Sequence, residues 1–400
     1  MLALLAILMA PWLWSFPTAL MTAELSSAMP EDGGYVIWVE RAFGRFWGFQ
    51  EGWLSWLTSF ADNALYPVMF VDYLAYLSGD MGPLERWLIS ASLISVITWL
   101  NICGTKFVGI SSVIFTLLVL APFAVMVLLG APQAQPSAWL AGTDKADWGL
   151  LLAIILWNTC GWDNAGCIAG EVEKPNKTYP RAMAVTVVLV TLAYFLPVAV
   201  GVGVDKSWGD WKEGYFPKVA AQIGGEWLGT WLTVAGLASA VGLFNALLCA
   251  SSRVPYAMAL RDTLPKPLAK LHPRYATPWF AILVNSIGVA ALIPFSFQEL
   301  VQVDMFLYAL ALILEFGALV WLRIKEPEMP RPYRVPFGTP GAIALSIPPI
   351  ILCVVSIWLA NNTTKLVSLG GIAVGLIVYW LMGLRRKVMN QIEVPSPSQN

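Results

Sequence analysis

Long apolar segments separated by short polar connections cover almost the whole chain. Runs of about 18 or more mostly apolar residues are long enough to cross a bilayer as a helix, and about eleven such runs occur. They cover residues 1–22, 50–77, 85–104, 107–130, 148–170, 182–204, 228–252, 278–297, 300–322, 340–360 and 366–384. The pattern predicts an all-α integral membrane protein in which residues 1–400 form a single transmembrane domain. Only the polar tail 388–400 is expected to be disordered.

Composition supports a membrane protein and excludes several other classes. Hydrophobic residues make up 58% of the chain and charged residues only 12%, against about 25% charged residues in soluble domains. The net charge of −1 gives no indication of a nucleic-acid partner. The 5 cysteines form no CxxC pair, and a single histidine is present, so we expect no metal, no cofactor and no enzymatic activity. The expected partners are the lipid bilayer and a small-molecule substrate.

The distribution of basic residues predicts the orientation. Most of the 24 Lys and Arg residues lie in the connections on one side, including the connection before the last two spans. Basic residues favour the cytoplasm, so we expect a cytoplasmic C-terminus. An odd number of spans then places Met1 outside, which suggests a further span before it and twelve in total. We expect the segment Tyr35–Trp47 to be an amphipathic helix at the cytoplasmic interface.

The stretch Trp157–Gly166 interrupts the apolar segment 148–170 with amides, an acid and two glycines. In hydrocarbon each unpaired backbone group costs several kcal/mol, so a broken helix is tolerated only inside protein or beside a watery cavity. Transporters hold substrates at such breaks. The candidate binding residues here are Trp157, Asn158, Thr159, Cys160, Gly161 and Asp163. Asn158 and Thr159 are expected to replace lost backbone bonds, and Asp163 either caps the freed amides or contacts substrate.

Ionisable residues inside membrane spans are costly, so each is expected to have a functional or structural role. The acids of this kind are Asp62, Asp163, Asp304 and Glu315. Asp62, Asn63 and Tyr66 lie on one side of a helix, either as an interhelical hydrogen-bond cluster or as a contact for substrate or protons. Tyr308 follows Asp304 by one turn and is expected to face a central cavity. The span-end acids Glu24, Glu171 and Glu173 are expected to pair with nearby Lys or Arg.

Four segments together resemble a known group of transporters. WNTCGWDNAGCIAGEVEKPNKTYP (157–180) resembles the sixth helix and following loop of the amino acid, polyamine and organocation (APC) superfamily. PEDGGYVIWVERAFGRFWGFQEG (30–52), DNALYPVMFVDYL (62–74) and FLYALALILEFGALVWLRIKEPEMPRPYRVP (306–336) resemble its polyamine uptake branch, known from plants and prokaryotic relatives.

The resemblance implies the inverted-repeat fold of that superfamily, with two five-helix repeats and two extra C-terminal helices. Residues 1–130 would form the first repeat without its first helix, 148–322 the second, and 340–384 the extra helices. Substrate would lie between the breaks of helices one and six. Further contacts would come from Asp62, Asn63, Phe244, Asn245 and Tyr308.

The resemblance also implies the function. We expect a secondary active transporter, or permease, of amino acids and/or polyamines, which works by alternating access, is coupled to protons and resides in the plasma membrane. The plant polyamine branch carries acids where this sequence has Thr18 and Asn245, which favours amino acids. The alternative is a truncated permease unable to transport, or a non-transporting membrane subunit.

Overall fold

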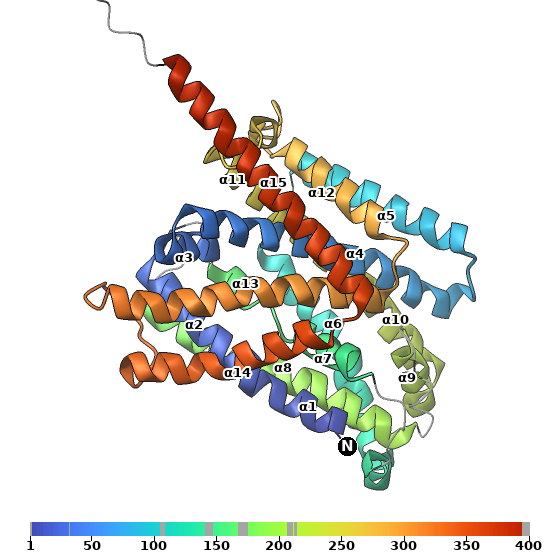
Figure 1. Cartoon of the computed structure of the whole chain (residues 1–400). Helices are drawn as coiled ribbons and strands as arrows, with labels where there is room; N and C mark the ends of the chain where they lie inside the picture. Colours follow the sequence, from blue (N-terminus) through green and yellow to red (C-terminus); the bar gives the residue numbers. More distant parts are fainter. Residues whose placement is uncertain are drawn as a thin grey trace, which may run out of the picture.

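The computed structural model describes residues 2–31, 33–104, 109–140, 147–166, 175–205, 211 and 214–393. Within these residues the chain forms helices and connections without a strand, so the predicted all-α class is confirmed (Figure 1).

Each of the predicted apolar segments contains a helix. The first segment comprises α1 (Leu2–Ala10), the π-helical turn η1 (Pro11–Ser15) and α2 (Phe16–Ala28). The other apolar segments contain α4 (Arg45–Ser78), α5 (Pro83–Cys103), α6 (Gly109–Gly130), α7 (Trp148–Trp157), α8 (Pro175–Val204), α10 (Glu226–Ser251), α12 (Trp279–Leu292), α13 (Phe297–Lys325), α14 (Gly338–Leu359) and α15 (Asn362–Glu393). Shorter helices connect them: α3 (Gly34–Phe43), α9 (Phe216–Gly224) and α11 (Arg253–Leu260).

Seven helices of the described residues are long and apolar enough to cross a membrane. Three more apolar helices are shorter, among them α7 and α12. Helix α4 has 34 residues but carries more polar side chains. These lengths agree with an integral membrane protein, and the total of eleven crossings and the two inverted repeats stay predictions.

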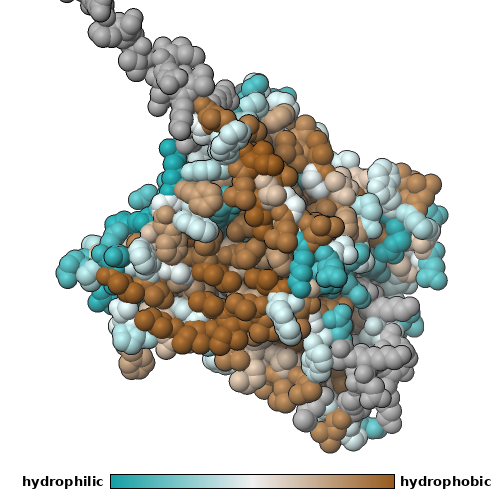
Figure 2. All heavy atoms as spheres, in the orientation of Figure 1, coloured by the Kyte–Doolittle hydropathy of each residue, from teal (hydrophilic) through white to brown (hydrophobic). Residues whose placement is uncertain are grey.

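The apolar exterior is most regular on α14. Its exposed side chains recur every three or four residues, at Ile343, Ile347, Ile351, Val354 and Trp358. This spacing forms one continuous stripe along a helix. Figure 2 shows hydrophobic atoms gathered over α14 and α15, with hydrophilic atoms at the end where α13 and α14 join. A surface of this kind suits contact with lipid.

Helix α13 lies at the centre of the bundle. Within its most apolar window 67% of the residues are buried, against 11–44% in the other six spans. It packs along α4, with Leu54 of α4 against Leu307 and Ala311 of α13. The buried side chains of this central pair also include acids, Glu51 of α4 and Asp304 and Glu315 of α13.

The segment Tyr35–Trp47 was predicted as one amphipathic helix, but its residues are divided between α3 and the start of α4. The helix ends at Phe43, and Gly44, with a φ of +89°, separates it from α4. Its apolar face covers protein, because the side chains of Trp38 and Val39 are fully buried. The ring of Trp38 packs against Gly166, where an added Cβ would lie 2.5 Å from it. The segment is therefore amphipathic but contributes to the core.

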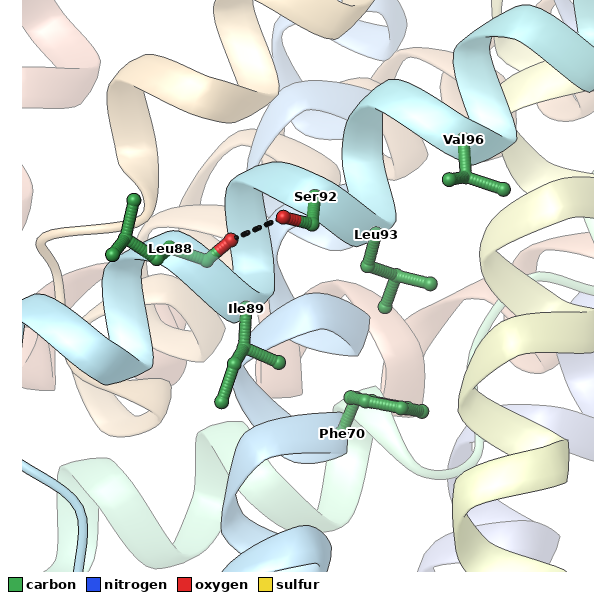
Figure 3. Close-up of a pocket in the computed structure, with 6 residues that line it drawn as sticks. All are labelled: Phe70, Leu88, Ile89, Ser92, Leu93 and Val96. Atoms are coloured by element: carbon green, nitrogen blue, oxygen red, sulfur yellow. Dashed lines mark hydrogen bonds between the residues drawn. The ribbon is translucent and has the colours of Figure 1, made fainter.

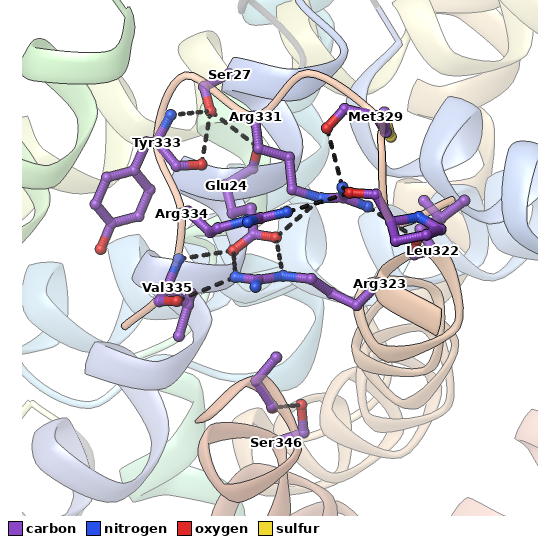
Figure 4. A network of polar contacts seen from close by, with 12 residues as sticks. Glu24, Ser27, Leu322, Arg323, Met329, Arg331, Tyr333, Arg334, Val335 and Ser346 are labelled. Carbon is purple, nitrogen blue, oxygen red and sulfur yellow. Dashed lines mark hydrogen bonds and ion pairs between the residues drawn. The ribbon is translucent and has the colours of Figure 1, made fainter. Parts of the chain in front are cut away.

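A buried ion-pair network joins α2, the end of α13 and the connection to α14 (Figure 4). Arg323 donates to both carboxylate oxygens of Glu24, at 2.6 and 2.5 Å. Arg331 lies 3.4 Å from the same carboxylate, and the backbone N–H of Val335 donates to it at 2.7 Å. The predicted pairing of Glu24 is confirmed, whereas Glu171 and Glu173 lie outside the described residues.

We expect Glu24→Gln to destabilise the protein, because it leaves two buried guanidinium groups without their anion. Removing one partner of a buried pair costs about 3–5 kcal/mol, so the melting temperature in detergent should fall clearly. The matched control is Glu326→Gln. Its hydrogen bond with Arg41 lowers the pKa of Glu326, but both side chains are exposed, and such pairs contribute about 0–1 kcal/mol. Equal shifts for the two variants would contradict a stabilising role for the buried network.

Candidate functional site

The broken helix is present where the sequence predicts it. Helix α7 begins at Trp148, with the Asp147 side chain accepting from the N–H of Leu150. It ends at Trp157, and residues 158–162 form no helix before a 3-10 turn at 163–166. Gly161 has a φ of +85°, a conformation that glycine adopts without steric cost. The polar residues between the two helical parts therefore lie inside the bundle.

Side chains satisfy the backbone groups that the break leaves free. Thr159 donates to the Ile155 carbonyl at 2.8 Å, as predicted. Asn158 donates at 2.8 Å to the Ile154 carbonyl, which already accepts from the backbone N–H of Asn158, so it replaces no lost bond there. The carbonyl of Thr159 accepts from the Trp162 indole at 2.8 Å and from the hydroxyl of Ser15 at 2.7 Å. Ser15 belongs to the π-helical turn η1, so the first apolar segment supports the break directly.

Tyr308 of α13 connects two groups of the break. Its hydroxyl donates to Asp163 Oδ1 at 2.5 Å and accepts from the N–H of Gly161 at 3.2 Å. Trp14 of η1 lies against the ring of Tyr308, with 6.1 Å between the ring centroids. Tyr308 thus fixes the distance between the break and the most buried span.

Asp62 of α4 approaches the break from another side. The Trp157 indole N–H donates to Asp62 Oδ1 at 3.1 Å, and the Tyr66 hydroxyl lies 3.5 Å from the same oxygen. The ring of Phe297, at the start of α13, packs edge to face against Trp157 at 5.6 Å. Trp157 therefore connects the start of the break both to Asp62 of α4 and to Phe297 of α13.

Three acids lie within electrostatic reach of Cys160. They are Asp62, Asp163 and Asp304, and the thiol itself donates to the Trp157 carbonyl at 3.1 Å. Asp304 is buried, and its Oδ1 has no hydrogen-bond partner among the described residues. None of the ion pairs within the described part of the chain involves these three acids. The site thus brings acidic side chains without a cation partner together near the broken helix.

The other predicted site residues make separate contacts. Asn63 donates to the Ser59 carbonyl at 2.6 Å and to the hydroxyl of Ser251 at 3.3 Å, towards α10. Asn245 accepts from Asn101 of α5 at 2.9 Å. Phe244 is fully buried in the main hydrophobic core. The structure gives none of these three a hydrogen bond to the break.

Sequence reasoning missed Ser15, Trp14 and Glu51. Pro11 and Pro17 flank the first two in the first segment, and such prolines signal a disturbed helix. Glu51 is fully buried on α4, yet it follows directly after the predicted start of its span, where an acid is usually solvated.

A hollow on the surface lies apart from this site. Figure 3 shows it between α4 and α5, lined by Phe70, Leu88, Ile89, Ser92, Leu93 and Val96. The hydroxyl of Ser92, its polar side chain, donates to the Leu88 carbonyl at 2.7 Å. The hollow offers no free polar group and carries no argument for binding.

Residues 1–382 match the amino acid permease family model. This chain belongs to the amino acid permease family. It is 41% identical over 381 residues to "Polyamine transporter PUT1" of Oryza sativa subsp. japonica, covering 94% of this chain and 72% of that protein. It is 39% identical over 385 residues to "Polyamine transporter RMV1" of Arabidopsis thaliana, with 94% and 78% covered. These similarities confirm the resemblance to the polyamine transporter branch of the APC superfamily.

A more distant relative is "Serine/threonine exchanger SteT" of Bacillus subtilis (strain 168), which is 26% identical over 329 residues, 78% of this chain and 74% of that protein. Family and relatives indicate a membrane transporter of small molecules and not an enzyme. They do not favour the alternative of a non-transporting subunit.

We expect Tyr308→Phe to loosen the break, because Asp163 and the Gly161 N–H lose their shared partner. An unsatisfied buried group costs about 1–3 kcal/mol, so backbone amides of residues 158–166 should exchange hydrogen for deuterium faster, through local opening. Tyr66→Phe is the matched control, because its hydroxyl makes only a 3.5 Å contact. Unchanged exchange in the Tyr308 variant would mean that the hydroxyl does not hold the break.

Proposed function

We propose that this permease is a secondary active transporter of polyamines that works by alternating access. The observation that carries the proposal is a set of three acids near the broken helix, the buried Asp163 and Asp304 and the half-buried Asp62. None of the three forms an ion pair within the described residues. Two relatives that are 41% and 39% identical to this chain over the aligned residues are named polyamine transporters, which supports the same substrate class.

Electrostatics favours a cationic substrate over an ordinary amino acid. A buried charge is costly unless a counter-charge compensates it, and the ammonium groups of a polyamine supply that charge. The α-carboxylate of an amino acid would instead meet three acids. We therefore revise the expectation from sequence, which favoured amino acids because acids are replaced at Thr18 and Asn245.

The contacts of these two positions agree with the revision. Thr18 donates to the Trp14 carbonyl of its own helix at 2.7 Å, and Asn245 pairs with Asn101. Both side chains are satisfied by protein groups, so neither position is free to bind a substrate cation. The aromatic rings of Trp157, Tyr66 and Tyr308 add surfaces that attract ammonium groups and cover methylene chains.

The proposed coupling ion is the proton. A carboxylate can bind either a proton or an ammonium group, so the same acids can exchange one for the other as the protein alternates between its two openings. The plasma membrane and a cytoplasmic C-terminus complete the proposal. The basic residues Arg41, Arg261 and Arg323 gather with their acidic partners at one end of the bundle, which agrees with that end facing the cytoplasm.

Uptake into proteoliposomes tests the substrate class. We expect saturable uptake of labelled spermidine that unlabelled polyamines inhibit and neutral amino acids do not. Asp163→Asn should lower uptake at least tenfold, because a hydrogen bond to a charged group contributes about 1.5–3 kcal/mol. Asp147→Asn is the control, since asparagine caps a helix as well as aspartate. Saturable uptake of a neutral amino acid without uptake of any polyamine would overturn the proposal.

An imposed proton gradient tests the coupling. With an acidic exterior we expect uptake of spermidine to rise above its level at equal pH, and a protonophore should remove the increase. A sodium gradient at equal pH should have no effect. Uptake that follows sodium and ignores pH would exclude the proton as coupling ion.

A further inference from the structure

Two further acids lie deep in the bundle, outside the site described above. Glu51 of α4 and Glu315 of α13 are 0% and 1% exposed. Each has a carboxylate oxygen, Oε2, without a hydrogen-bond partner among the described residues. The only hydrogen bond to either carboxylate within that part of the chain is from Ser55 to Glu51 Oε1, at 3.2 Å. Buried carboxylate oxygens normally have a hydrogen-bond partner, so the two unsatisfied oxygens need a structural or functional explanation.

The packing of α4 against α13 brings these acids to the same end of the pair. Leu54 of α4 lies in one buried apolar cluster with Leu307 and Ala311 of α13, and the two helices run in opposite directions (Figure 1). Glu51 precedes Leu54 and Glu315 follows Ala311, so both acids lie to one side of this cluster. Asp62 follows Leu54 and Asp304 precedes Leu307, so these two lie to its other side. Electrostatic interactions act within both pairs.

The two pairs of acids lie far apart along the bundle. Glu51 and Asp62 are separated by 11 residues, as are Asp304 and Glu315, which is about three helical turns or roughly 16 Å at 1.5 Å per residue. Asp163 interacts electrostatically with both Glu51 and Glu315, and it is held by Tyr308, which lies between Asp304 and Glu315 on α13. The carboxylates thus form a series along the axis of the central pair.

Glu24 shows how this protein buries an acid for a structural purpose. Glu24 is as deeply buried as Glu51, but two arginines and a backbone N–H satisfy its carboxylate. Glu51 and Glu315 have no cation partner among the ion pairs of the described residues. Their free oxygens and their positions at the same end of the α4–α13 pair therefore point to a cation from outside the chain.

We propose that Glu51 and Glu315 form a second ammonium-binding subsite, which takes the distal amine of an elongated oligoamine while Asp62 and Asp304 take the other end. The inference rests on the proposed function and extends it to substrate length. A diamine with four carbons is much shorter than the separation of the two pairs of acids, whereas an extended tetraamine such as spermine approaches it. The bundle then selects long oligoamines over short diamines.

Equilibrium binding to the purified full chain tests this subsite. The probes are spermine, 1,4-diaminobutane and a series of α,ω-diamines of increasing length, each measured by displacement of labelled spermine. For the unaltered protein we expect affinity to rise with chain length. Glu315→Gln and Glu51→Gln should each lower the affinity for spermine at least tenfold. They should change the affinity for 1,4-diaminobutane by less than twofold. Glu315→Asp should restore most of the length dependence. Glu299→Gln, at a half-buried acid in the first turn of α13, is the control and should leave the affinity for both ligands unchanged.

Each outcome decides the inference. Equal losses for spermine and 1,4-diaminobutane in the glutamine variants would overturn it, as would losses confined to proton-driven uptake with binding intact. If the glutamine variants do not fold, the diamine series on the unaltered protein still tests the second subsite. An affinity that does not depend on the chain length of the diamine would exclude it. Absence of binding by any amine would instead overturn the proposed function itself.

Discussion

The hydroxyl of Tyr308 is the contact on which the site depends. It donates to Asp163 and accepts from the Gly161 N–H, so one atom satisfies a carboxylate and a backbone amide inside the packed bundle. A shift of α13 relative to the break would break the hydrogen bonds of Tyr308 to Asp163 and to the Gly161 N–H. In the function proposed above, a substrate ammonium at Asp163 would compete with Tyr308 for the same carboxylate. Such binding would be physically coupled to the position of the break, as alternating access requires.

The protein buries acids in two different ways. Glu24 is neutralised by Arg323 and Arg331 and ties the end of α13 to α2. Asp304 and Glu315 lie on the same α13 but leave carboxylate oxygens unsatisfied. A buried acid without a partner lowers the stability of the fold. The ion pairs of Glu24 at the end of α13 therefore offset the loss of stability that Asp304 and Glu315 cause. The arginine network holds in place the helix that presents the site.

Much of the fold could be predicted from sequence, because the bilayer imposes a length on every apolar segment. The helix break was also predictable, because amides, an acid and glycines in an apolar run disfavour a continuous helix there. The neighbours of single side chains were not predictable. Asp62 and Asn63 are adjacent, yet Asp62 meets Trp157 whereas Asn63 meets Ser251. Neighbouring helix positions point about 100° apart, and only the packed bundle decides what each direction contains.

The spacing of the central acids shows why packing adds information. Both intervals, from Glu51 to Asp62 and from Asp304 to Glu315, are visible in the sequence, and each places two acids on one helix face. The intervals acquire meaning only through the antiparallel packing of α4 and α13, which brings Glu51 and Glu315 to one end of the pair and Asp62 and Asp304 to the other. A parallel arrangement would place each acid beside different neighbours. Apolar residues such as Leu54, Leu307 and Ala311 pack together between the two helices, so residues without any charge position the acids of the site.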